Sequence, residues 1–264
     1  MSNVPRKFLR FLPTPKRILR LLSPFNQFAN VSNDYVPMEP DAIGSTFENA
    51  WKDPEIPSRQ RSLVDQQIAS YRKSEPNPVF DALVTTLRSN IENLDSKSLI
   101  EIGCSSGYYS EVLKIKGIFS EYRGCDYSES FIKMARKKYP NIPFDVEDAT
   151  QLTYGTGSFD IVISGCCILH IRNFESAVSE AARISRRHVV FHRTPVLHLG
   201  GHHYFRKKAY GVETMEIHFN EQMLVDLFRA KGMHIIGINT HSISGVQESQ
   251  DVLAMKTYLC EKIQ

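Results

Sequence analysis

Short apolar runs alternate with helical hydrophobic patterns from residue 98 to about residue 195. The apolar runs predict buried strands, and apolar residues that recur every three or four positions predict helices between them. The expected strands are 98–102, 122–126, 143–146, 159–164 and 187–193, and the expected helices are 107–116, 128–138 and 173–185. This alternation predicts an α/β fold in which helices wrap a parallel sheet.

Further elements are expected on both sides of this region. They are helices around 59–72 and 78–91 before it, and a helix at 221–231 with β-rich runs at 233–239 and 252–260 after it. The helix at 221–231 begins after Asn220, a favourable cap residue, and stops before Gly232. The two late runs suit a hairpin that closes the sheet.

The patterns divide the chain into three segments. Residues 1–45 form a basic N-terminal segment and a linker, since 23–45 hold Pro, Asn, Ser and Asp without periodicity. Residues 46–97 form a helical extension, and residues 98–264 form the main domain. The connection at about 194–219 is long for a loop between a strand and a helix, so we expect a cap-like insertion there.

Positive charge is concentrated at the N-terminus. The chain has a formal net charge of +3, but residues 1–22 contain six Lys or Arg and no acid, which leaves the remainder at −3. Such a body lacks the basic surface typical of nucleic-acid-binding proteins, so no nucleic-acid partner is expected. Phe and Leu among the N-terminal cations indicate a peripheral membrane contact. The alternatives are a tail that docks on its own domain and an organellar transit peptide.

Composition narrows the expected compartment. No apolar run approaches the roughly 18 residues that span a bilayer, and the N-terminus does not resemble a secretory signal. The five cysteines form no zinc-like CxxC pair, so we expect reduced thiols and no metal site. A cytoplasmic location follows as the default, with contact at the inner face of a membrane through residues 1–22.

A glycine-containing turn separates the strand at 98–102 from the helix that follows it. It contains the residues Glu101-Ile102-Gly103-Cys104-Ser105-Ser106-Gly107. Glycine lets the backbone turn tightly and approach a ligand closely. Ligands of open α/β sheets bind at the carboxyl ends of the strands, where this turn lies. Nicotinamide-dependent oxidoreductases also have such a turn, but their GxGxxG pattern is absent here.

Three carboxylates accompany the turn. Glu101 ends the first strand and can orient the turn or hold an ammonium group. Asp126 ends the second strand, where a carboxylate can accept hydrogen bonds from both hydroxyls of a ribose. Asp148 follows the third strand, where it can accept a hydrogen bond from an adenine amine. An adenosylated amino acid would satisfy all three groups.

Three segments carry a resemblance to a known family. LIEIGCSSGYY, GCDYSESFIKMARKKYP and VEDATQLTYGTGSFDIVISGCCILHI resemble consecutive motifs of class I S-adenosylmethionine-dependent methyltransferases of the small-molecule type. The resemblance covers about 98–195 and extends loosely to 260. It implies S-adenosyl-L-methionine as cofactor. It also implies a Rossmann-like, seven-stranded, mostly parallel sheet with one antiparallel strand and helices on both faces.

The resemblance also implies which residues bind the cofactor. In chain order they are Glu101, Gly103, Cys104, Ser105, Gly107, Tyr108, Asp126, Tyr127, Asp148, Ala149 and Cys166. Of these, the methionine part would be surrounded by Glu101, Gly103 and Gly107. Asp126 would take the ribose, Asp148 with Ala149 the adenine, and Cys166 would lie beside the sulfonium. Ser105 stands where many members have glycine, and its small side chain should still fit.

Histidines are the candidates for a catalytic base. Methyl transfer from a sulfonium is an in-line displacement, and a hydroxyl or amine acceptor benefits both from orientation and from a base. His170 follows the fourth strand, and His202 and His203 lie in the connection at 194–219; a structural role is the alternative for each. The expected acceptor is a small molecule, a glycan or a lipid-linked compound, methylated on oxygen or nitrogen.

The segments that flank the central region, and one motif that is absent, give further indications of the methyl acceptor. The flanking segments AWKDPEIPSRQRSLVDQQI and KKAYGVETMEIHFNE look like uncharacterised bacterial methyltransferases associated with surface-glycan or lipid biosynthesis. The Asn/Asp-Pro-Pro-aromatic element of nucleic-acid amino-methyltransferases does not follow the fourth strand. Two other functions stay open at this point. They are a non-catalytic S-adenosylmethionine-binding protein of the same fold and a nicotinamide-dependent oxidoreductase.

Overall fold

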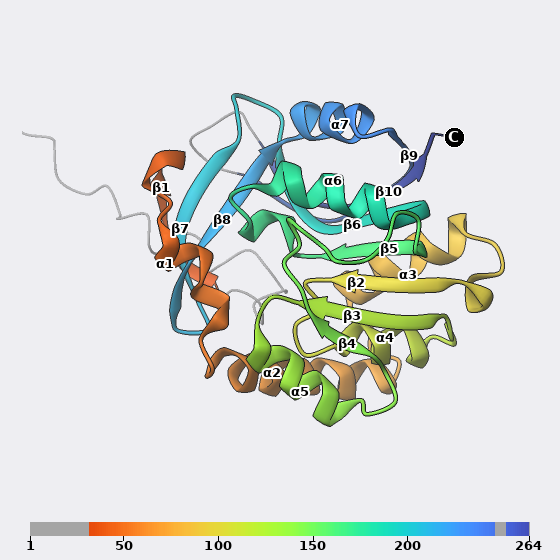
Figure 1. The fold of residues 1–264 in the computed structure, drawn as a ribbon. Helices are drawn as coiled ribbons and strands as arrows, with labels where there is room; N and C mark the ends of the chain where they lie inside the picture. The colour runs from red at the N-terminus through yellow and green to blue at the C-terminus, as the bar shows by residue number, and fades with distance from the viewer. Residues whose placement is uncertain (1–31, 246–251, 264) are drawn as a thin grey trace, which may run out of the picture.

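A twisted sheet runs through the computed structural model, which describes residues 32–245 and 252–263. Its parallel strands are hydrogen-bonded in the order β4-β3-β2-β5-β6 (Figure 1). They are β2 (Ser98–Ile102), β3 (Glu121–Asp126), β4 (Phe144–Val146), β5 (Phe159–Gly165) and β6 (Ser185–Leu197). β10 (Val252–Lys262) extends this sheet antiparallel to β6, and β9 (Met233–Gly245) pairs with β10. The predicted mostly parallel sheet with one antiparallel strand is confirmed.

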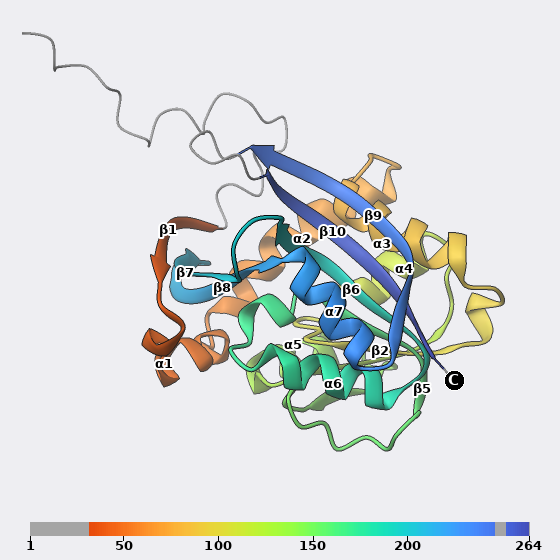
Figure 2. The same cartoon turned by 90° about the horizontal axis from the view of Figure 1, so that it is seen from above.

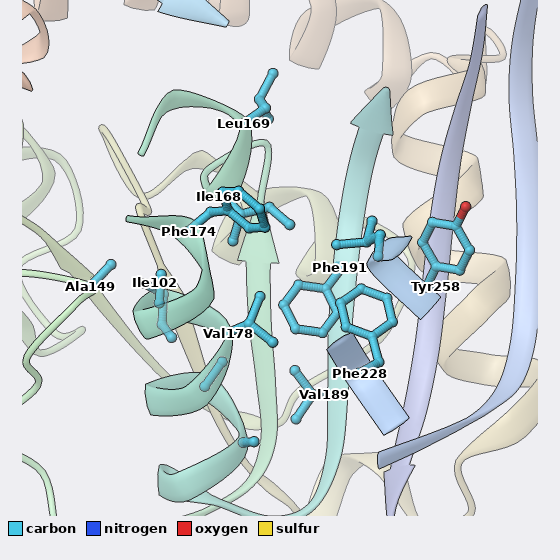
Figure 3. Close-up of a cluster of buried hydrophobic side chains, with 14 of the residues drawn as sticks. Ile102, Ala149, Ile168, Leu169, Phe174, Val178, Val189, Phe191, Phe228 and Tyr258 are labelled. Atoms are coloured by element: carbon cyan, nitrogen blue, oxygen red, sulfur yellow. The ribbon is translucent and has the colours of Figure 1, made fainter. Parts of the chain in front are cut away.

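Helices cover both faces of this sheet (Figure 2). One face carries α6 (Phe174–Ile184) and α7 (Glu221–Ala230). Figure 3 shows part of the core beneath them, where the rings of Phe191 and Phe228 stack with their centroids 4.3 Å apart. The opposite face carries α2 (Ile56–Arg72), α3 (Pro78–Asn90), α4 (Tyr108–Ile115) and α5 (Glu129–Lys138). Each of these helices was expected, because its apolar residues recur at helical spacing and are buried against the strands.

The sheet is longer than predicted at the end of β6. β7 (His203–Ala209) and β8 (Val212–Asn220) form an antiparallel hairpin, and β1 (Ser32–Met38) pairs with β7. The pairing of β5 with β6 ends at His192, but β6 continues to Leu197, and its tip pairs with β8. The prediction of a linker throughout 23–45 was therefore wrong at 32–38, and the connection at 194–219 contains a hairpin, whose role as a cap stays a prediction. Both segments contribute strands. The part of β6 that extends beyond β5 offers backbone N–H and C=O groups to β8, and β7 and β1 then pair in turn.

Short helices link these elements. They are η2 (Pro40–Ala42), α1 (Ser45–Glu48), η3 (Ala50–Lys52), η4 (Leu94–Ser96) and η5 (Ile168–His170). No helix within the described residues is both long and apolar enough to cross a membrane. The basic segment 1–22 lies outside the described residues, so its membrane contact stays a prediction.

Candidate active site

The turn after β2 has the backbone geometry that its sequence predicts. Gly103 and Gly107 adopt φ of 69° and 71°, a region that favours glycine, and Ser105 adopts φ of 48°. A Cβ at Gly103 would lie 2.6 Å from Cys167 Sγ, and one at Gly107 would lie 2.5 Å from the Phe144 ring. The turn is therefore packed tightly between the end of β5 and the start of β4, and neither glycine can be replaced without displacing a neighbour.

The Asp126 carboxylate joins this turn to α5. Its Oδ2 accepts a hydrogen bond from the Ser105 N–H at 2.9 Å, and its Oδ1 accepts one from the Ser128 N–H at 2.9 Å. Each oxygen keeps a second acceptor position. Burial raises the pKa of Asp126 to about 6, although the two N–H donors offset part of that effect. The carboxylate thus fixes the turn and can still accept hydroxyl donors from a ligand.

Glu101 supplies a second, more deeply buried carboxylate. The residue is 1% exposed, and the Tyr122 hydroxyl donates to its Oε2. A Cβ at Gly165 would lie 2.8 Å from its Oε1, so this oxygen lies directly beside the end of β5. Burial raises the pKa of Glu101 well above its usual value, and the Tyr122 hydrogen bond only partly opposes this. A buried carboxylate of this kind is stabilised by a cationic partner such as an ammonium group.

The remaining residues expected at the cofactor lie around the same edge, with different exposure. Asp148 is exposed, and its Oδ1 accepts hydrogen bonds from the N–H and the hydroxyl of Thr150, whereas Ala149 is buried in the core cluster that contains Ile102. The Cys104 side chain is fully buried, with its Sγ beside Gly124, so only its backbone could contact a ligand.

Tyr108 has neighbours from several elements of the candidate site. Its ring packs on Tyr109 with a centroid separation of 4.5 Å, and its electrostatic neighbours include Glu101, Cys166 and Arg193. Cys166 itself adopts φ of 58°, and its N–H donates to the His192 carbonyl at 2.9 Å. Tyr108 thus has both the buried carboxylate of Glu101 and Arg193 among its neighbours, and Arg193 is in turn a neighbour of a second group of polar side chains around His170.

His170 belongs to that second group. Its Nδ1 lies 2.7 Å from the Met215 carbonyl oxygen. Because a carbonyl can only accept, Nδ1 carries the proton and the neutral ring presents an unprotonated Nε2. Burial lowers the pKa of His170 to about 4, and the Lys207 charge adds to this effect. The ring is therefore neutral at physiological pH, in the tautomer that a base requires.

The sequence patterns gave no indication of Trp51, the only tryptophan of the chain. Its ring lies 4.8 Å from that of His170 and 6.2 Å from that of Tyr210, and its backbone N–H donates to the Tyr127 hydroxyl at 3.2 Å. The indole N–H is buried and makes no hydrogen bond to any residue that the structure describes. η3 therefore bridges Tyr127, the neighbour of Asp126, and His170. We refer to Trp51, His170, Tyr210 and Arg193 as the His170 cluster.

The other two predicted histidines have different surroundings. His202 Nδ1 accepts the Asn220 N–H at 3.0 Å, and its ring packs edge-on against Phe174 and Phe219. These contacts give His202 a structural role at the end of β8. His203 is exposed and pairs with His218 across the β7–β8 hairpin. Trp51 and Arg193 connect His170 with the region of the turn after β2. His202 and His203 lie outside the His170 cluster.

The strand order and the site together define a class of protein. A central sheet in the order β4-β3-β2-β5-β6-β10-β9, with β10 antiparallel and a glycine turn after β2, is the Rossmann-like fold of class I methyltransferases. Residues 100–191 match the family model described as a methyltransferase domain. The chain thus carries the domain and the fold of class I S-adenosylmethionine-dependent methyltransferases. This match favours that interpretation over a nicotinamide-dependent oxidoreductase.

Individual relatives match the central region of the chain. Norajmaline N-methyltransferase of Rauvolfia serpentina is 31% identical over 96 residues, which are 34% of this chain and 32% of that protein. Malonyl-acyl-carrier-protein O-methyltransferase of Bacillus cereus is 27% identical over 99 residues, which are 37% of this chain and 36% of that protein. The chain therefore spans about a third of the length of these curated relatives.

Solved structures share the fold over most of the chain. The 1,6-didemethyltoxoflavin-N1-methyltransferase of Burkholderia thailandensis superposes with a TM-score of 0.55 at 13% identity, over 87% of this chain and 95% of that one. Magnesium protoporphyrin IX methyltransferase of Synechocystis gives a TM-score of 0.51 at 17% identity, over 85% and 95%. At these identities the likeness establishes the fold alone.

Proposed function

We propose that this protein transfers a methyl group from S-adenosylmethionine to the oxygen or nitrogen of a small molecule. The observation that carries the proposal is that two buried carboxylates and a tight turn lie at the ends of β2 and β3, and that Trp51 links a neutral histidine, His170, to this region. The proposal includes the acceptor class expected from the sequence, which is a small molecule, a glycan or a lipid-linked compound.

The residues present fit the cofactor. The raised pKa of Glu101 reflects a buried carboxylate that an ammonium group would stabilise. Both Asp126 oxygens have an acceptor position left for the ribose hydroxyls, and Asp148 lies beside the buried Ala149 for the adenine. When bound, S-adenosylmethionine supplies an electrophilic methyl group on a sulfonium. These residues orient that group and make no covalent bond.

The His170 cluster would act on the acceptor. The unprotonated Nε2 of His170 can take the proton that a hydroxyl or amine loses as its oxygen or nitrogen forms the bond to carbon. Trp51 packs on the His170 ring and restricts its orientation. Positioning of the two reactants supplies much of the rate, because it converts a bimolecular step into an effectively unimolecular one. A base adds a further factor of about 10²–10⁴.

Loss of the Asp126 carboxylate should weaken cofactor binding. Hydrogen bonds to a charged group contribute about 1.5–3 kcal/mol, so Asp126→Ala should raise the Kd for S-adenosylhomocysteine by about tenfold or more. Isothermal titration calorimetry measures this directly. Asp226→Ala, which removes an exposed carboxylate from α7, serves as the matched control. Unchanged affinity in Asp126→Ala would remove this residue from the proposed site.

The same carboxylate predicts how affinity depends on pH. The ionised form of Asp126 accepts the ribose hydroxyls, so affinity should be highest above the pKa of about 6 and fall as the pH drops through it. Calorimetric titrations between about pH 5 and about pH 8 would measure this fall. Asp126→Asn cannot titrate and should remove this part of the profile. If the variant and the wild type show the same fall, another group is responsible.

Methyl transfer itself separates an enzyme from a protein that only binds the cofactor. Purified protein, loaded with S-adenosylmethionine labelled on the methyl group, would be mixed with the small-molecule fraction of a cell extract under single-turnover conditions. The proposal expects labelled product together with S-adenosylhomocysteine. Binding of S-adenosylhomocysteine without transfer to any fraction, including extracted lipids and glycans, would favour the non-catalytic alternative.

A further inference from the structure

A short segment before α2 contacts both the predicted cofactor residues and His170. It comprises residues 40–52 with η2, α1 and η3, and both α1 and η3 contact β8 (Figure 1). We refer to residues 40–52 as the N-terminal strap. The first part of the strap is held close to η5, because the Arg172 guanidinium donates to the Ile43 carbonyl at 3.1 Å and the Ile43 side chain is buried in the core.

The last part of the strap is held by Tyr127. The backbone N–H of Trp51 donates to the Tyr127 hydroxyl at 3.2 Å, and Lys52 Nζ lies 5.1 Å from the centroid of the Tyr127 ring. Tyr127 directly follows Asp126 and has Asp148 among its electrostatic neighbours. These two carboxylates are the groups predicted to bind the ribose and the adenine. A cofactor bound to them would therefore lie next to the residue that anchors the strap.

The Trp51 side chain restricts the His170 ring. The side-chain hydrogen bond of His170 within the described residues joins Nδ1 to the Met215 carbonyl at 2.7 Å, and a single bond of this kind leaves the ring free to tilt. The Trp51 ring lies 4.8 Å from the His170 ring at an interplanar angle of 52° and limits this tilt. Trp51 also packs edge-on against Tyr210, whose carbonyl accepts a hydrogen bond from Arg59 at 2.8 Å.

The stability of the strap alone does not explain a tryptophan at position 51. The indole N–H is buried and makes no hydrogen bond to any residue in the part of the chain that the structure describes. A buried donor without an acceptor destabilises a folded protein, and such exceptions to the pairing of polar groups occur at functional sites. An aromatic side chain without an N–H would avoid this loss, so the position of Trp51 between Tyr127 and His170 calls for a functional reason.

We propose that Trp51 is a positioning residue that links occupancy of the cofactor site, through Tyr127, to the orientation of the His170 ring. This inference rests on the proposed function, because it takes His170 as the base. A catalytic group must be held within about 0.5 Å of its productive position, and a displacement of about 1 Å can lower a rate about 10²-fold. A bound cofactor would favour the arrangement in which Tyr127 holds the strap, and hence the restricted His170 ring.

The first test uses the fluorescence of the full chain, which reports Trp51 because it is the only tryptophan. Titration of the wild type with S-adenosylhomocysteine should change the emission, with a midpoint within about threefold of the Kd from calorimetry. At saturating ligand, Tyr127→Phe lacks the hydroxyl that accepts the Trp51 N–H and should lose most of this change. Tyr154→Phe removes a hydroxyl that donates to Asp145 away from the strap, and this matched control should respond as the wild type does.

The second test observes His170 by NMR in protein that contains isotope-labelled histidine. The signals that disappear in His170→Gln identify this residue. In the wild type the ring should stay neutral, with the proton on Nδ1, down to about pH 5, because its pKa is about 4. Trp51→Leu should allow the second tautomer and should raise the pKa toward the ordinary value of about 6.5, because water reaches the ring. Phe119→Leu, which replaces an exposed aromatic residue, serves as the control.

The charged groups around His170 stay the same in these variants. They are Lys207 of β7, Glu216 of β8 and Arg193 of β6. A rise in the pKa of His170 in Trp51→Leu therefore reports the lost packing of the ring and not a changed charge. If Trp51→Leu does not fold, the tautomer of His170 in Tyr127→Phe, with saturating S-adenosylhomocysteine, provides the same comparison.

Each outcome bears on one of the two proposals. This inference is overturned if the wild type binds S-adenosylhomocysteine without a change in Trp51 emission, or if Tyr127→Phe responds as the wild type does. It is also overturned if His170 keeps the tautomer and the pKa of the wild type in Trp51→Leu. If calorimetry shows that the wild type does not bind S-adenosylhomocysteine, the proposed function fails, and this inference fails with it.

Discussion

Replacement of His170 by glutamine is expected to lower kcat by about 10²–10⁴. Glutamine can keep a hydrogen bond to the Met215 carbonyl, but it has no group that accepts a proton at neutral pH. The KM for S-adenosylmethionine should change little, because the carboxylates that would hold the cofactor are Glu101 and Asp126. Single-turnover rates with saturating acceptor would measure the chemical step without the contribution of product release.

The pH dependence of the same step provides a second measurement. His170 acts as a base only when its Nε2 is unprotonated, so the rate should fall as the pH drops through its pKa of about 4 and be flat above it. The fall in cofactor affinity through Asp126 lies higher, near pH 6, and therefore separates from it. His234→Gln, at an exposed position of β9, is the matched control. A His170→Gln variant with the rate of the wild type would assign catalysis to positioning alone.

The central sheet could be predicted because each of its strands carries its own signal. Ile100, Val162 and Val189 belong to short apolar runs that are buried on both faces of a parallel sheet. The ends of such strands share one edge, so the turn after β2, Glu101 and Asp126 could be expected near each other from their positions alone. The spatial neighbours of these residues confirm that expectation of proximity, while their roles stay predictions.

The strands beyond β6 could not be predicted in the same way. Tyr35 and Val36 of β1 are exposed, so this strand has no apolar pattern of its own and exists through its pairing with β7. The β7–β8 hairpin carries a buried ion pair between Lys207 and Glu216, and charged residues in a sequence favour an exposed loop. Non-local pairing decides both cases, and a single sequence does not reveal its partners.

The residues of the proposed acceptor side could not be predicted from sequence patterns either, for two physical reasons. Trp51 lies in a segment without helical or strand periodicity, and its contact with His170 depends on how α1 and η3 fold across β8. The second reason is that residues 187–193 have the pattern of a regular strand, in which side chains alternate between the two faces. A β-bulge, in which His192 and Arg193 of β6 lie opposite the single residue Thr257 of β10, interrupts that alternation, and it arises only from the register between the two strands.

Gly103→Ala is expected to disrupt the turn strongly. The new Cβ would lie 2.6 Å from Cys167 Sγ and 2.8 Å from Cys167 Cβ, and alanine would also have to adopt φ of 69°. The left-handed backbone costs about 1–2 kcal/mol and the overpacking about 1–3 kcal/mol, so the free energy of unfolding should fall by about 2–5 kcal/mol. Urea denaturation would measure this change from the shift of the midpoint.

Gly157→Ala separates these two contributions. Gly157 has nearly the same φ, 64°, but no heavy atom lies within 4 Å of the position where its Cβ would be. This control should therefore lose only the backbone contribution of about 1–2 kcal/mol and should bind S-adenosylhomocysteine as the wild type does. Gly103→Ala should lose more stability than the control and should also bind the ligand more weakly, because relief of the clash moves the turn against Asp126. Equal losses in the two variants would mean that the close approach to Cys167 does not constrain the turn.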